Sequence, residues 1–112
     1  MSSAWENFFA ATAVLASAGP IKHRLAEAFY EHLADLEEDE LPREIRDEFT
    51  SLSTALSSVR PLKGETAVQA TVRKMSDMEA GGCAVRIVGM LGVLARLQAA
   101  QRAPKLRAVG ED

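Results

Sequence analysis

The segment KMSDMEAGGCAVRIVGMLGVLARLQ, residues 74–98, is the most apolar part of this chain and decides its fold class. It opens with a capping box at Ser76 and Glu79, in which a hydroxyl and a carboxylate three residues apart satisfy the first backbone amides of a helix. Apolar side chains then recur at alternating steps of four and three residues, at Cys83, Ile87, Met90, Leu94 and Leu97. This period predicts a long helix from about residue 76 to residue 101.

The opposite side of this helix is built mainly from small residues, among them Gly82, Gly89 and Ala100. Small side chains let another backbone approach closely, so we expect other helices to cover both sides of this one. The helix is then either central in the fold or at a subunit interface, with Gly89 and Gly92 at the close contact. The predicted interface residues are Cys83, Ile87, Gly89, Met90, Gly92 and Leu94.

Two other roles fit this segment less well. A membrane span would carry Arg86 and Arg96, and an arginine at mid-membrane costs a few kcal/mol. A DNA-recognition helix presents polar side chains to base edges near its N-terminus, whereas this helix begins with Asp77 and Glu79, which phosphates repel. We therefore expect neither membrane insertion nor DNA binding through this helix.

Two helices are expected at the start of the chain. Ser3 and Glu6 form another capping box, and the helix that they begin ends at Gly19-Pro20. Glycine tolerates the left-handed turn that closes a helix, and proline has no amide to donate. The second helix follows directly, with apolar side chains at helical spacing at Ile21, Leu25, Phe29, Leu33 and Leu36.

The middle of the chain adds a third helix and an ambiguous segment. The acidic run Glu37–Glu40 reads as a loop that leads into a helix from about Pro42 to Val59. Residues 66–75 fit a strand or a helix, but a lone strand would lack a partner, so we favour a short helix. The predicted fold is an all-α bundle of four or five helices, mostly antiparallel. One domain covers residues 1–103, and a short polar tail covers residues 104–112.

Composition places the protein among ordinary globular domains. The 112 residues are 47% apolar and 26% charged, which suits one packed core. The lone cysteine, Cys83, has no disulfide partner, so a reducing compartment is expected. The N-terminal residues include an apolar run but lack the basic start of a signal peptide, so we expect a cytoplasmic protein. The abundance of alanine and arginine suits a bacterial genome of high GC content.

No residue set in the sequence points to catalysis. His23, Glu27 and Glu31 are spaced one helical turn apart and could hold a metal or share a proton, but the chain has two histidines in all. A solvated pair at the edge of a helix is the favoured explanation for His23 and Glu27. Cys83 is placed on an apolar face, which favours a buried thiol over a nucleophile. We therefore expect no catalytic residue, no metal site and no cofactor.

Charge is divided unevenly along the chain. Residues 1–59 hold four basic and eleven acidic residues, and residues 60–112 hold nine basic and five acidic ones, so the halves carry −7 and +4. The halves could attract one another within the fold or across a dimer. This mutual attraction is the favoured interpretation, and the alternative is a basic patch for nucleic acid or for an acidic protein. That patch would comprise Arg60, Lys63, Arg73, Lys74, Arg102, Lys105 and Arg107.

These observations lead to one principal expectation and one alternative. The principal expectation is a small cytoplasmic interaction or regulatory protein that acts as a homodimer without catalysis. The alternative is a nucleic-acid-associated regulator that uses the basic C-terminal half.

Overall fold

Helix starts in this chain are fixed by local side-chain chemistry. In the computed structural model, the Oγ of Ser3 accepts a hydrogen bond from the amide of Glu6 (3.2 Å), and the Oγ of Ser76 accepts one from the amide of Glu79 (3.0 Å). Each glutamate carboxylate returns a bond to the serine amide. Both capping boxes therefore begin helices where the sequence predicts them. A third box, formed by Thr66 and Gln69, begins a short helix that the sequence left ambiguous.

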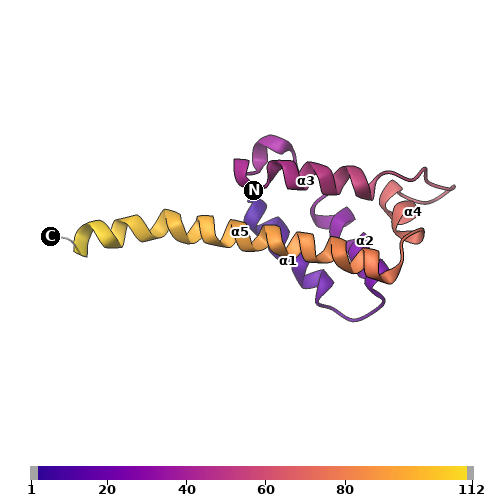
Figure 1. Cartoon of the computed structure of the whole chain (residues 1–112), viewed down its shortest axis with the longest axis horizontal. Helices are drawn as coiled ribbons and strands as arrows, with labels where there is room; N and C mark the ends of the chain where they lie inside the picture. The colour runs from indigo at the N-terminus through magenta and orange to yellow at the C-terminus, as the bar shows by residue number, and fades with distance from the viewer. Residues whose placement is uncertain (1–2, 111–112) are drawn as a thin grey trace.

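The structure describes the backbone of residues 3–110 and the side chains of residues 3–101. Over this range the chain forms five α-helices and one 3-10 turn, without strands (Figure 1). The prediction of an all-α bundle is confirmed, and residues 66–75 are mostly helical. The elements are α1 (Ala4–Leu15), α2 (Ile21–His32), η1 (Glu38–Glu40), α3 (Arg43–Leu56), α4 (Ala67–Arg73) and α5 (Asp77–Gly110).

Helix ends differ from the predicted ones because side chains and loops intervene. Helix α2 ends at His32 and not near Leu36. The acidic residues that follow Leu36 would lie at the C-terminus of a longer helix, where they oppose the helix macrodipole. Helix α3 stops at Leu56, and the amide of Val59 donates instead to the Oγ1 of Thr71 at 3.1 Å. Helix α5 continues to Gly110, past the end predicted near residue 101.

Aromatic and aliphatic side chains from all five α-helices meet in one core. The ring of Phe49 on α3 lies edge-on to Phe8 of α1, with centroids 5.9 Å apart, and is stacked with Phe29 of α2 at 6.4 Å. Ile87 of α5 is completely buried in the same cluster. Three of the six aromatic residues therefore meet where α1, α2 and α3 converge.

Helix α5 is the central element of the bundle. It packs against α1, α2 and α3, and the short helix α4 covers the remaining sides of α2 and α3. Its C-terminal part continues beyond the other helices, which gives the molecule its length of 64 Å against 28 and 23 Å across (Figure 1). The core-facing side chains of α5 are Ala80, Ala84, Ile87, Met90 and Leu94.

Candidate interaction surface

The surface with the clearest functional signal lies where α1 runs alongside α5. The side chain of Trp5 shares a groove of about 250 Å³ with Ala95 and Ala99, near the far end of α5. Thr12 shares a second groove of about 320 Å³ with Val85 and Val88. The start of α1 thus lies beside the later part of α5, so the two helices are antiparallel. We define the α1–α5 face by the residues Trp5, Phe9, Thr12, Val85, Val88 and Ala95.

Large apolar side chains on this face are open to solvent. Phe9 is 58% exposed, Val85 is 70% exposed and Val88 is 46% exposed. The rings of Trp5 and Phe9 lie 5.9 Å apart at a tilt of 41°, so they form one aromatic ridge on α1. Scattered apolar residues on a surface are ordinary, but a continuous apolar face is typical of a binding surface.

The outward side of α5 continues this face with a row of residues that includes three glycines. Gly82, Val85, Gly89, Gly92 and Arg96 recur at alternating steps of three and four, and we call this row the α5 ridge. A methyl group added at Gly82 or Gly89 would meet no other atom within 4 Å. At Gly92 it would meet the Arg96 guanidinium at 3.8 Å. The close helix contact expected at Gly89 and Gly92 is therefore not made within one copy of the chain.

The predicted interface residues are divided between two sides of α5. Ile87, Met90 and Leu94 are buried in the chain's own core, so they are not available to a partner. Cys83 is half-buried at the edge of that core, and burial raises the pKa of its thiol. Gly89 and Gly92 lie on the outward ridge. The two glycines are thus the members of the predicted set that a partner can reach.

Sequence reasoning missed the exposed apolar residues that surround these glycines. Their signal was present in α1, where Trp5, Phe9, Thr12 and Ala16 recur at steps of four, three and four. This row runs beside the core row of Phe8 and its neighbours. Because both rows are apolar, periodicity alone does not tell which of them faces the core.

Beside this face, an ion pair joins α3 to α5. The Nε of Arg86 donates to a carboxylate oxygen of Glu48 at 2.6 Å, and its Nη2 donates to the Oγ of Ser51 at 3.1 Å. The hydrogen bond from Arg86 holds the pKa of Glu48 below its ordinary value. Arg86 is therefore neutralised by its own chain, so it adds little net charge next to the α5 ridge.

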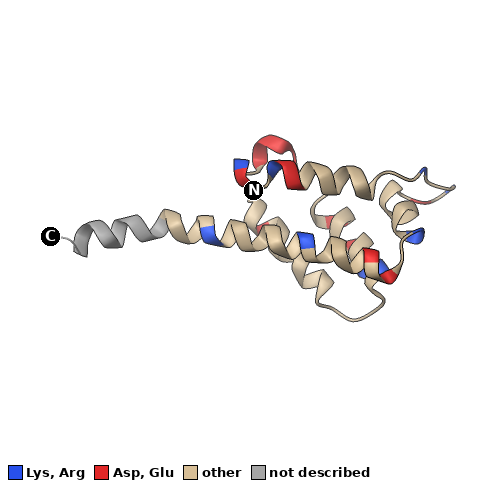
Figure 2. Ribbon diagram, in the orientation of Figure 1, with Lys and Arg blue, Asp and Glu red and all other residues tan. Residues whose placement is uncertain are grey.

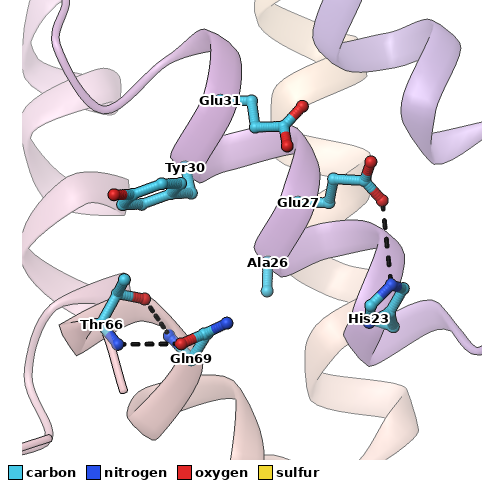
Figure 3. A pocket seen from close by; sticks show the side chains of 7 residues that line it. All are labelled: His23, Ala26, Glu27, Tyr30, Glu31, Thr66 and Gln69. Carbon is cyan, nitrogen blue, oxygen red and sulfur yellow. Dashed lines mark hydrogen bonds and ion pairs between the residues drawn. The ribbon is translucent and has the colours of Figure 1, made fainter. Parts of the chain in front are cut away.

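A polar pocket of about 430 Å³ lies between α2 and α4 (Figure 3). His23 and Glu27 form a pair at 3.9 Å on its rim, and their side chains are 75% and 44% exposed. Tyr30 lies across the pocket from the capping box of Thr66 and Gln69. Among residues with described side chains, no group of three metal-ligating side chains forms here or elsewhere. The pocket therefore offers a hydrated, acidic surface.

The structure describes the side chains of only part of the predicted basic patch. Arg60, Lys63, Arg73 and Lys74 are exposed around the α3–α4 loop and the end of α4 (Figure 2). Arg73 makes a two-point bond with the carboxylate of Glu65, at 2.8 and 3.1 Å, so its charge is largely compensated. The other members, Arg102, Lys105 and Arg107, lie outside the residues whose side chains are described.

Acidic residues gather at a different place. Figure 2 shows them concentrated on η1 and on the first turns of α3. This acidic cluster and the described members of the basic patch thus lie on separate parts of the surface, while the pair of Arg86 and Glu48 joins the two halves of the chain.

Helix α5 also meets a simple length and composition test for a membrane span. The segment Asp77–Gln101 has a mean hydropathy of 1.5 in its most apolar window, of which 28% is buried. The core helix of a soluble bundle passes the same test, so this is weak evidence for insertion.

Comparison of the chain with protein-family models, with curated proteins and with solved structures finds no match. The geometry of the chain itself therefore carries the functional argument.

Proposed function

We propose that this protein is a small cytoplasmic interaction or regulatory protein that acts as a homodimer, without catalysis, through the α1–α5 face. The observation that carries the proposal is the exposure of three large apolar side chains, Phe9, Val85 and Val88, beside the open glycines of α5. Self-association would remove this surface from water, and burial of apolar area contributes about 25 cal/mol per Å².

The dimensions of the face suit a stable interface. An α-helix rises about 1.5 Å per residue, so the outward side of α5 from Met78 to Ala99 extends for roughly 30 Å. Stable protein interfaces bury about 800 Å² on each partner. A strip of this length, widened by the aromatic ridge of α1, offers an area of that order.

The test is the molar mass in solution, measured by light scattering over a range of concentrations. We expect a dimer for the parent chain and a monomer for Val88→Asp, because the substitution places a charge in the centre of the apolar face. Leu62→Asp is the matched control, since Leu62 is also exposed, at 61%, but lies in the α3–α4 loop. It should remain dimeric. A parent chain that stays monomeric at high micromolar concentration would contradict the proposal.

A further inference from the structure

We propose that the α5 helices of the two copies cross in antiparallel orientation. The two-fold axis passes between the two helices, at the level of residue 87 along α5. This inference rests on the proposed self-association and specifies how the second copy is seated. The geometry of α5 supports two contacts between the copies. Val85 of each copy packs onto the partner subunit's Gly89, and Arg96 of each copy lies between the partner subunit's Asp77 and Glu79.

The shape of the α5 ridge supports this register. Residues 85 and 89 are equally distant from residue 87, and so are residues 82 and 92. An antiparallel pair centred there places each exposed Val85 against a glycine that has open space around it, and places Gly82 against Gly92. A parallel pair would instead set the two Val85 side chains against each other and leave a gap where the two Gly89 residues meet. Interfaces pack at the density of protein interiors, so the antiparallel register fits better.

Charge independently favours the same arrangement. Asp77 and Glu79 stand at the N-terminus of α5, and Arg96 stands on the ridge near the other end. Residues 78 and 96 are also equally distant from residue 87, so Arg96 faces the partner subunit's Met78 and lies near the carboxylates of Asp77 and Glu79 on either side of it. Neither Asp77 nor Arg96 belongs to an ion pair among the described side chains. A parallel pair would bring acids against acids and arginine against arginine, which costs free energy.

Shape and side-chain charge therefore select one orientation for a second copy. A lipid surface, the other occupant of this face that its hydropathy suggests, has no counterpart for the opposite charges at the two ends of the ridge.

The orientation is tested by disulfide cross-linking in a Cys83→Ser background. Gly82→Cys and Gly92→Cys chains, mixed and oxidised, should give the mixed dimer, because these positions face each other. Each chain alone should give little cross-linked product, since its two cysteines lie about 15 Å apart along the helix axis, beyond the reach of a disulfide. Efficient cross-linking of either chain alone would show a parallel pair. Absence of any product would also overturn the proposed register.

The charge arrangement is tested by reversal and restoration. Arg96→Glu should weaken dimerisation by roughly tenfold, equivalent to about 1.4 kcal/mol, and the loss should shrink at high salt. Adding Asp77→Arg to the same chain should recover most of the affinity, with the urea midpoint measured on each variant to check folding. An unchanged affinity for Arg96→Glu, or a further loss in the double variant, would overturn the ion pairs.

The two proposals fail in different ways. A parent chain that is monomeric by light scattering overturns both of them. A dimeric parent without the expected mixed disulfide overturns the antiparallel register and leaves self-association standing. Co-sedimentation of the monomeric parent with lipid vesicles would identify a membrane as the occupant of the face and overturn the second copy.

Discussion

At the scale of single residues, two glycines in equally open surroundings have opposite roles. An added methyl group meets no atom within 4 Å at either Gly64 or Gly89. Gly64 has a φ of 85°, a left-handed conformation that side chains disfavour, whereas Gly89 lies within a regular helix. Backbone conformation, and not available space, therefore decides the effect of substitution within one copy.

We predict that Gly89→Ala stabilises the monomer by about 0.5–1 kcal/mol, because alanine favours the helix more than glycine does. Gly64→Ala should destabilise it by about 1 kcal/mol, since alanine must adopt the strained turn. Urea midpoints at a protein concentration low enough to keep the chain monomeric provide the measurement. A destabilised Gly89→Ala monomer would mean that this side of α5 is covered within the chain.

At the scale of elements, the ion pair between Arg86 and Glu48 links α3 to α5 and depends on pH. The pKa of Glu48 is lowered in the folded protein by the hydrogen bond from Arg86. A lowered carboxyl pKa stabilises the fold fully above the unfolded-state pKa of about 4.3 and progressively less as pH falls through the folded-state value. The link between α3 and α5 is therefore weakened in acid.

We predict that Arg86→Met lowers the free energy of unfolding at pH 7 by about 0.5 kcal/mol, a modest figure because the pair is partly exposed. The difference in unfolding free energy between Arg86→Met and the parent should become smaller below about pH 4.3, as Glu48 takes up a proton. Arg43→Met, at an exposed position on α3, is the control and should show no such narrowing. Urea unfolding at several pH values measures both. A difference that stays constant down to pH 2 would contradict the assigned role of the pair.

Elements also show how far the sequence could predict the structure. The starts of α1 and α5 were predictable because Ser3 and Ser76 act on amides within their own turn. The end of α3 was not, since the amide of Val59 is bound by Thr71, a residue from another helix. Likewise, Ile87 and Val85 are equally apolar, and packing against α1, α2 and α3 decides that Ile87 is buried. Helix capping can be predicted from neighbouring residues, whereas packing against residues distant in the sequence determines which of two apolar faces is buried.

At the scale of the whole molecule, the candidate ligand groups among the described side chains are too dispersed to retain a metal ion. His23 has Glu27 as its paired neighbour, and both are largely hydrated. We predict that protein purified without added metal carries far less than one equivalent of zinc or iron, because a dedicated site needs three or four converging ligands. Elemental analysis measures this directly. A stoichiometric metal content would contradict the interpretation of the α2–α4 pocket as a hydrated surface.

The central position of α5 also has a consequence for the order of folding during synthesis. Helices α1, α2 and α3 emerge from the ribosome first, yet the side chains that complete their core, such as Ile87 and Met90, lie on α5. Contacts between α1 and α5 join residues far apart in the sequence, and such contacts form late because closing a long loop costs entropy. Until α5 has been made, Phe8 is covered only in part, by Phe49 of α3 and by the packing of α1 on α2. In the cell, a chaperone that binds exposed apolar side chains protects the protein most during this interval.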